Sequence, residues 1–287
     1  MAIRVAINGF GRIGRAFARL SRNRNIEIIA VNDLGSLENL AYLLKHDTVY
    51  GQAPFSVQVR LKQKGVDNLA LVIDDKEVRF LSEKDPANLP WKELDIDVVV
   101  EATGFFTEYE KARAHITAGA RRVVITAPAK GDGGETVLMG VNEEKLATCQ
   151  ISSNASCTTN AASPVIAILD EAIGIEKAVL STAHAYTASQ SIVDGPSKKD
   201  MREGRAAAQN IVPTSTGAAT AVAQAYGPLA GKFDGIALRV PVPAGSIADI
   251  TFIAKRQTTR EEVNEALRSA AKTKRWEGIF KTTDEQL

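Results

Sequence analysis

Short apolar runs alternate with amphipathic stretches along the first half of the chain. The apolar runs, rich in β-branched residues, cover residues 3–7, 26–31, 95–101 and 122–126. Helical patterns cover residues 15–22, 37–46 and 111–118. Continuous apolar runs are typical of strands buried in a parallel sheet, and their alternation with helices predicts an α/β fold. We therefore expect a doubly wound Rossmann domain over residues 1–155, with one further strand at residues 137–141.

The second half of the chain shows a different pattern. Helices are expected at residues 157–173, after Gly217 and at residues 258–272, with Thr259 as the cap of the last one. A strand is expected at residues 177–184, and residues 236–242 and 247–254 alternate as strands of a half-exposed sheet do. We expect an α+β catalytic domain with a mainly antiparallel sheet over residues 156–287.

A glycine-rich loop joins the first predicted strand to the first predicted helix. Its glycines, Gly9, Gly11 and Gly14, have the G-x-G-x-x-G spacing that lets a backbone approach a pyrophosphate at a helix N-terminus. Asp33 ends the second strand about 20 residues further on, where a carboxylate accepts hydrogen bonds from ribose hydroxyls. A carboxylate there repels a 2′-phosphate, so the pattern favours NAD over NADP. The structural alternative is a glycine turn with a surface aspartate.

Small residues close the later strands of this domain. Ligands of doubly wound sheets bind at the carboxyl ends of strands, where small side chains leave room. The cofactor-binding set expected from the loop and these strand ends is Gly9, Gly11, Arg12, Ile13, Gly14, Asp33, Thr103, Gly104 and Thr126.

Composition excludes several classes of protein. The 287 residues include 35 Lys plus Arg and 34 Asp plus Glu, a net charge of +1, which gives no reason to expect nucleic acid or an anionic membrane as the main partner. No apolar run has the length of a membrane span, and no cleavable signal pattern is present at the N-terminus. The two cysteines form neither a disulfide framework nor a metal cluster. We expect a cytoplasmic protein with reduced thiols and no metal.

One cysteine stands in a position that favours reactivity. Ser156 is a suitable N-cap for the helix at residues 157–173, so Cys157 falls in its first turn. The helix dipole there favours a thiolate. Taken alone, a buried structural cysteine after a cap is the more common explanation. Cys149 has no such neighbours, and we assign it no catalytic role.

Several motifs together resemble one family over the whole chain. They are INGFGRIGR (residues 7–15), VND (31–33), EATGFF (101–106), SNASCTTN (153–160), HAYTASQ (184–190), DGPS (194–197), PTSTGAA (213–219) and RVPVP (239–243). In this order and spacing the chain is similar to the phosphorylating glyceraldehyde-3-phosphate dehydrogenases.

The resemblance implies an NAD-dependent oxidoreductase of glycolysis, with a role for each matched residue. Cys157 would attack the aldehyde of glyceraldehyde 3-phosphate, and His184 would pair with the thiol and act as the base in the oxidation. Thr187 and Arg239 would hold the substrate phosphate. The attacking inorganic phosphate would be held by Ser156, Thr158, Thr216 and Gly217, with Arg202 close by. A homotetramer, built around the loop at residues 189–210, is also implied.

The chain departs from the family pattern at four places. Many relatives carry a cysteine where Ala161 stands, and many carry an arginine where Lys84 stands, in a segment that contacts the adenine side of the cofactor. Residues 244–246 read Ala-Gly-Ser in place of Asn-Val-Ser. The sequence stops at Leu287, where family chains continue. On the resemblance we expect a catalytic domain incomplete at its C-terminus and a chain that is unstable or inactive when expressed alone.

Three alternatives stay open at this stage. An erythrose-4-phosphate dehydrogenase shares the fold, the cysteine and the histidine. An NADP-linked biosynthetic form is disfavoured by Asp33 and by the pair Gly195-Pro196. A non-catalytic NAD- or RNA-binding protein on the same scaffold is disfavoured because a binding protein needs no activated thiol at Cys157.

Overall fold

Two compact units make up the chain. The computed structural model describes residues 1–60, 69–197 and 200–286. One unit consists of Met1–Glu135 and Leu146–Asn154, and the other of Thr136–Lys145 and Ala155–Leu287. The first unit is therefore interrupted in sequence by ten residues, 136–145, that pack with the second.

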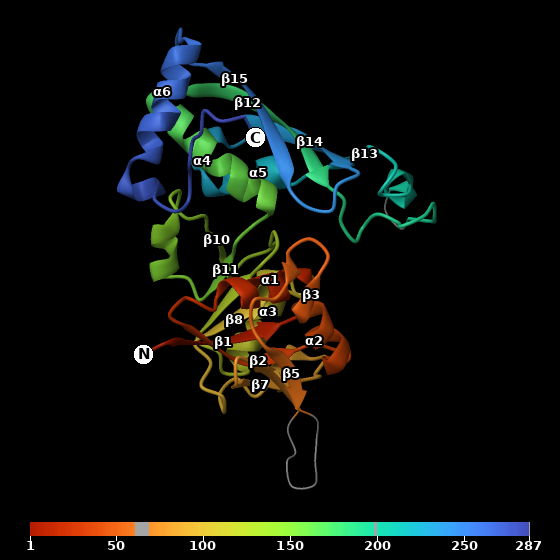
Figure 1. Cartoon of the computed structure of the whole chain (residues 1–287). Helices are drawn as coiled ribbons and strands as arrows, with labels where there is room; N and C mark the ends of the chain where they lie inside the picture. Colours follow the sequence, from red (N-terminus) through yellow and green to blue (C-terminus); the bar gives the residue numbers. More distant parts are fainter. Residues whose placement is uncertain (61–68, 198–199, 287) are drawn as a thin grey trace. The chain divides into compact units, whose positions relative to one another are not determined.

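The first unit is built on one large sheet (Figure 1). Within the described part of the chain its strands are β1 (Ile3–Asn8), β2 (Ile26–Asn32), β5 (Val57–Arg60), β6 (Ala70–Ile73), β7 (Lys76–Leu81), β8 (Val98–Glu101), β9 (Arg122–Ile125), β10 (Glu135–Thr136) and β11 (Ile151–Ser153). Their order is β10-β11-β9-β8-β1-β2-β7-β6-β5. The neighbours from β11 through β9, β8, β1 and β2 to β7 are parallel, whereas β7, β6 and β5 pair antiparallel. A separate small hairpin joins β3 (His46–Asp47) to β4 (Gly51–Gln52).

Helices cover both faces of this sheet. Successive residues of a strand point to opposite sides, so each strand packs with helices on both faces. Ile7 and Val31 pack with residues of α1 (Arg12–Leu20) and α2 (Leu37–Lys45). Ala6 and Ala30, their neighbours in sequence, pack on the other side with residues of α3 (Tyr109–Thr117). The predicted doubly wound Rossmann fold is confirmed.

The chain leaves β1 toward β2 on one side and later returns to β8 on the other. Their parallel register sets Asn8 beside Asn32 and beside Glu101. Crevices at such a switch in strand order are where open α/β sheets bind ligands. A ligand of this unit is therefore expected at the carboxyl ends of β1, β2 and β8.

The prediction of a strand at residues 137–141 is wrong. Val137 and Leu138 are buried, but the segment forms a turn in which Gly140 has φ of +77°. The side-chain oxygen of Asn142 accepts the backbone N–H of Leu138 at 2.8 Å, a bond that a sheet neighbour otherwise supplies. Leu138 packs with Ala155 and residues of α5, so the apolar run corresponds to a buried turn and not to a strand.

The second unit has a smaller sheet covered by helices (Figure 1). In the described residues its order is β13 (Val212–Ser215), β14 (Phe233–Val240), β12 (Ile175–Ala185) and β15 (Ser246–Ala254). β12 is parallel to β14 and antiparallel to β15, and β13 is antiparallel to β14, which confirms a mainly antiparallel sheet. The helices are α4 (Cys157–Ala172), α5 (Ala218–Ala225) and α6 (Arg260–Ala271).

One apolar core joins the helices of the second unit to its sheet. Ile166 of α4, Val222 of α5 and Leu180 of β12 belong to it, and α6 adds Val263 and Leu267. This core holds the N-terminus of α4 against the sheet whose strand β12 ends close to it. No helix in residues 1–60, 69–197 and 200–286 is both long and apolar enough to cross a membrane.

Candidate active site

The N-terminus of α4 presents the cysteine. Ser156 is the N-cap, and its hydroxyl accepts the backbone N–H of Thr159 at 3.0 Å. The residue before it, Ala155, is buried and has φ of +52°, a left-handed conformation that costs a non-glycine residue roughly 1–2 kcal/mol. Cys157 follows as the first residue of α4 and is exposed. Unpaired backbone N–H groups and the helix dipole favour negative charge at this position.

His184 faces the cysteine from the end of β12. Its Nε2 lies 3.1 Å from Sγ of Cys157, within hydrogen-bond reach for a sulfur. Its Nδ1 lies 2.7 Å from the carbonyl oxygen of Ala185. A nucleophile and a base within hydrogen-bond distance of one another form the arrangement that covalent catalysis requires.

Arg239 orients the histidine from the neighbouring strand. The register of β12 and β14 sets His184 beside Arg239, and Nη1 of the arginine lies 2.7 Å from Nδ1 of the histidine. Nδ1 thus lies between a carbonyl oxygen, which only accepts hydrogen bonds, and a guanidinium, which only donates them. These contacts hold the ring with Nε2 toward the sulfur of Cys157.

Arg239 also has an unused donor. Its Nε is buried and, among the described residues, has no hydrogen-bond partner. Buried polar groups without partners are rare in native proteins and point to a missing ligand or water. A guanidinium held beside a nucleophile with a donor to spare is suited to binding an anion.

The other predicted phosphate-binding residues lie in loops and helix ends of the same unit. Thr187 follows β12, is exposed, and places its hydroxyl 3.0 Å from that of Ser189. Thr216 accepts the N–H of Ala218 at 3.1 Å, just before α5, and Gly217 is the N-cap of that helix. Thr158 is buried in the first turn of α4. Arg202 is exposed and paired with Asp200 at 2.7 Å, and no contact joins it to Cys157 or His184 among the described residues.

A cavity of about 500 Å³ lies in the first unit, at the carboxyl ends of β1, β2 and β8. Five of the predicted cofactor residues line it: Gly9, Gly11, Asp33, Lys84 and Thr103. Gly9 has φ of +93°, and a Cβ there would lie 2.6 Å from the backbone N of Thr103. A Cβ on Gly11 would meet nothing within 4 Å, so the loop leaves open space at the start of α1. This shape fits a pyrophosphate at the helix N-terminus.

Asp33 is placed to receive ribose. One oxygen of its carboxylate accepts the N–H of Phe10 at 2.6 Å and the other accepts the N–H of Gly35 at 2.8 Å. Each carboxylate oxygen has two lone pairs, so both keep one for a hydroxyl donor. The residues present thus fit NAD, whose ribose offers such donors.

Five of the predicted cofactor residues do not line the cavity. Ile13 is exposed, Gly14 packs against the carbonyl of Gly9, and Gly104 has φ of +75°. Thr126 donates its hydroxyl to the carbonyl of Glu101 at 3.1 Å.

Arg12, the last of the five, pairs with Asp47 at 3.1 Å. Burial by itself raises the pKa of Asp47, but N–H groups of Tyr50 and Val49 and the charge of Arg12 outweigh it and hold the pKa below its usual value. The carboxylate stays charged, and this exposed pair keeps the side chain of Arg12 toward the β3–β4 hairpin.

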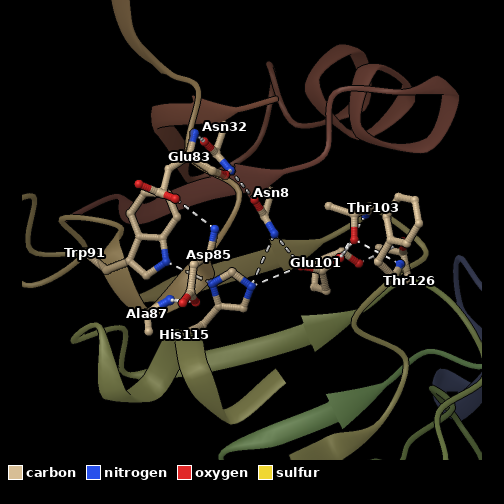
Figure 2. A network of polar contacts seen from close by, with 11 residues as sticks. Asn8, Asn32, Glu83, Asp85, Ala87, Trp91, Glu101, Thr103, His115 and Thr126 are labelled. Atoms are coloured by element: carbon tan, nitrogen blue, oxygen red, sulfur yellow. Dashed lines mark hydrogen bonds and ion pairs between the residues drawn. The ribbon is translucent and has the colours of Figure 1, made fainter. Parts of the chain in front are cut away.

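Residues outside the predicted set also line the cavity: Asn8, Asn32, Leu34, Glu83, Ala102, Phe105 and Phe106. Asn8 and Asn32 are buried polar residues that end β1 and β2, and Phe105 is a strongly exposed aromatic. Because both residues are polar and stand at predicted strand ends close to the glycine loop, the sequence could have indicated that they line the cavity. The contacts that join Asn8, Asn32 and Glu101 into one network (Figure 2) link different strands, so the sequence did not indicate them.

Two family profiles match the chain. The NAD binding domain of glyceraldehyde 3-phosphate dehydrogenase matches residues 3–109, and the C-terminal domain of the same enzyme matches residues 156–287. The chain belongs to the glyceraldehyde-3-phosphate dehydrogenase family. It is an NAD-dependent oxidoreductase, as the sequence analysis predicted.

Named members of this family are similar over the full chain. The glyceraldehyde-3-phosphate dehydrogenase of Zymomonas mobilis is 49% identical, covering 100% of this chain and 84% of the relative. That of Streptomyces coelicolor is 47% identical with the same coverage. Glyceraldehyde-3-phosphate dehydrogenase 2 of Bacillus subtilis is 46% identical, covering 100% of this chain and 82% of the relative.

Proposed function

We propose that this protein catalyses the NAD-dependent, phosphorylating oxidation of D-glyceraldehyde 3-phosphate to 1,3-bisphosphoglycerate. The observation that carries the proposal is the 3.1 Å contact between Sγ of Cys157 and Nε2 of His184 at the N-terminus of α4. An aldehyde oxidation that passes through a thioester needs a thiolate nucleophile and a proton acceptor beside it. Family membership and the names of the relatives support the choice of substrate.

Nε2 of His184 first takes the proton of the Cys157 thiol, and the thiolate sulfur then forms a bond to the aldehyde carbon. The carbonyl π electrons move to the oxygen, which takes the proton from Nε2 of His184 and leaves a thiohemiacetal. Backbone N–H groups at the start of α4 stabilise the developing oxyanion. When bound in the cavity of the first unit, NAD would supply the hydride acceptor for the oxidation. As the C–H electron pair departs, Nε2 takes the hydroxyl proton back, and Cys157 holds a thioester.

Phosphate then releases the product. An oxygen of inorganic phosphate attacks the thioester carbon, the C–S bond breaks, and Cys157 returns as a thiolate. The acyl phosphate leaves with one phosphate oxygen bonded to the acyl carbon in place of sulfur. Because the thiolate is both attacking and leaving group, its stabilisation by the helix N-terminus and by the N–H of His184 serves both ends of the cycle.

We assign the two phosphate groups to different sets of residues. The substrate phosphate is held by Arg239, whose buried Nε has no partner among the described residues, together with Thr187. The attacking phosphate is held by hydroxyl and backbone N–H groups around the two helix N-termini, with Arg202 contributing charge: Ser156, Thr158, Thr216 and Gly217. In both sets charged or dipolar donors meet an anion.

The test is a steady-state assay on the natively purified protein. NADH formation is expected with glyceraldehyde 3-phosphate, NAD and inorganic phosphate, and omission of phosphate is expected to abolish turnover after a burst that acylates Cys157. Erythrose 4-phosphate and NADP are compared by kcat/KM. A higher kcat/KM for erythrose 4-phosphate than for glyceraldehyde 3-phosphate contradicts the proposed substrate, and turnover that is independent of phosphate contradicts the proposed reaction.

The same proposal includes a homotetramer. Support comes from exposed apolar side chains in and beside the loop at residues 189–210, namely Ile192, Val193, Met201 and Ile211. Such side chains are commonly covered by protein–protein contact. Light scattering on the native protein is expected to give four times the mass of the chain, and a monomer would contradict this part.

A further inference from the structure

A buried carboxylate lies beneath the cofactor pocket. Glu101 ends β8, is 2% exposed, and receives four donors (Figure 2). One oxygen accepts the backbone N–H of Thr103 at 2.8 Å and also the hydroxyl of Thr103. The other accepts Nδ2 of Asn8 at 2.6 Å and Nε2 of His115 at 3.0 Å. A carboxylate with four donors is fully satisfied in its ionised form, which allows the charge to be buried.

The neighbours of His115 determine which of its ring nitrogens carries the proton. This histidine is fully buried, and its Nδ1 lies 3.0 Å from Nε1 of Trp91. An indole N–H is a donor only, so Nδ1 accepts and the ring proton is on Nε2, directed at Glu101. Trp91 is itself fully buried in the core beneath the sheet. The core therefore sets the orientation of the carboxylate through His115.

Glu101 holds two backbone segments that touch each other. Asn8 directly precedes Gly9, and a Cβ on Gly9 would come within 2.6 Å of the same Thr103 nitrogen that Glu101 binds. The glycine loop thus rests on a peptide group fixed by Glu101, and its first residue is fixed by the same carboxylate. The hydroxyl of Thr103 is used inward, so Thr103 shapes the pocket without offering this donor to a ligand.

The network continues to the other wall of the pocket. Oδ1 of Asn8 accepts Nδ2 of Asn32 at 2.7 Å. Asn32 in turn donates to the carbonyl of Glu83 at 2.8 Å and accepts its N–H at 2.8 Å. Glu83 and its neighbour Lys84 line the cavity. A single carboxylate is therefore connected to the ends of three strands and to the segment that follows a fourth.

We propose that Glu101 is a positioning residue for NAD: it holds the glycine loop, Thr103 and, through Asn8 and Asn32, the Glu83–Lys84 segment in the geometry that accepts the dinucleotide. It acts through these residues and makes no contact with the cavity of its own. The proposal rests on NAD binding, which family membership shows, and not on the aldehyde chemistry proposed above. Measurements of NAD binding therefore test the role of Glu101, and the aldehyde assay tests the proposed reaction independently.

Glu101→Gln tests the proposal with a side chain of the same shape. An amide must turn its NH₂ group toward either the N–H of Thr103 or the donors of Asn8 and His115, so one side of the network is left with donor facing donor. The dissociation constants for NAD and for ADP-ribose are expected to rise at least tenfold. The rate at which iodoacetamide alkylates Cys157 without cofactor is expected to stay within twofold, because Cys157 belongs to the other unit.

Two variants of His115 form a matched pair. His115→Gln keeps an amide donor toward Glu101 and an acceptor toward Trp91, and NAD affinity is expected within about twofold of the unmodified protein. His115→Phe removes both and is expected to raise the dissociation constant for NAD at least threefold. Glu108→Gln, at an exposed ion pair with Lys111 at the start of α3, serves as the control and is expected to change nothing.

A folded Glu101→Gln protein that binds NAD within twofold of the unmodified protein overturns the proposal. The proposal is also overturned if the apparent rise in the dissociation constant is fully explained by the fraction of unfolded protein, which circular dichroism measures in the same samples. If Glu101→Gln does not fold, the His115 pair decides: equal NAD affinity in the Gln and Phe variants overturns the proposal, and loss in Phe alone supports it.

Discussion

Nη1 of Arg239 lies 2.7 Å from Nδ1 of His184, on the edge of the ring opposite to the nitrogen that faces the thiol of Cys157. The arginine therefore holds the imidazole from the side opposite to the sulfur. Residues on two neighbouring parallel strands thus act on one thiol, and the register His184 beside Arg239 makes this possible.

Replacing Arg239 by lysine is expected to lower kcat/KM for glyceraldehyde 3-phosphate roughly 10- to 100-fold, since charged hydrogen bonds contribute about 1.5–3 kcal/mol each. An ammonium keeps the charge but not the planar fork that reaches both His184 and an anion. Alkylation of Cys157 is expected to slow as well, because the imidazole loses a contact that holds it beside the thiol. Arg260→Lys, at an exposed pair with Glu261, is the control. Unchanged kinetics in Arg239→Lys would contradict the assignment.

Cys157→Ser is expected to lower kcat by at least about a thousandfold, because a serine hydroxyl at this position is neither ionised nor a good leaving group from an ester. NAD affinity, measured by fluorescence titration, is expected to be unchanged. Cys149→Ser is the matched control and is expected to keep full activity. Retention of more than a few per cent of the activity in the Cys157 variant would rule out the covalent route.

Gly9→Ala is expected to destabilise the protein, whereas Gly11→Ala is tolerated. A Cβ on Gly9 lies 2.6 to 2.8 Å from backbone atoms of Ala102 and Thr103, and its φ of +93° is unfavourable for alanine. Together these give a loss of about 2–4 kcal/mol. The Cβ of Gly11 meets nothing within 4 Å. Urea unfolding of both variants without cofactor measures the difference, and equal free energies of unfolding would contradict this account of the loop.

Acid is expected to weaken the start of α6. Hydrogen bonds from Arg256 and Thr258 lower the pKa of Glu262 to about 2, below that of an unfolded chain. A carboxyl with a depressed folded-state pKa stabilises the fold above its unfolded pKa of about 4.3 and loses this contribution as pH falls toward 2. Glu262→Gln is therefore expected to unfold more easily at pH 7. The difference from the unmodified protein, followed by thermal unfolding, is expected to vanish near pH 2, and a constant difference from pH 7 to pH 2 would exclude this explanation.

Some of the site could be predicted from sequence because the relevant interactions are local. The Ser156 cap involves residues three apart, and the glycine loop with Asp33 is a short βαβ pattern. The strand predicted at residues 137–141 failed because a buried turn and a buried strand have the same apolar composition. Only the side chain of Asn142, which accepts a backbone N–H there, distinguishes the two.

By itself the sequence determined the two fold classes, the helix that carries Cys157 and the kind of cofactor, because each depends on residue order within about 30 residues. The tertiary structure alone decided which distant groups meet. It placed Arg239 behind His184 through strand register, and it joined Glu101, Asn8 and His115 at the ends of separate strands and a helix. Hydrogen bonds extend only about 3 Å, so partners many residues apart in sequence become definite only when the sheets have formed.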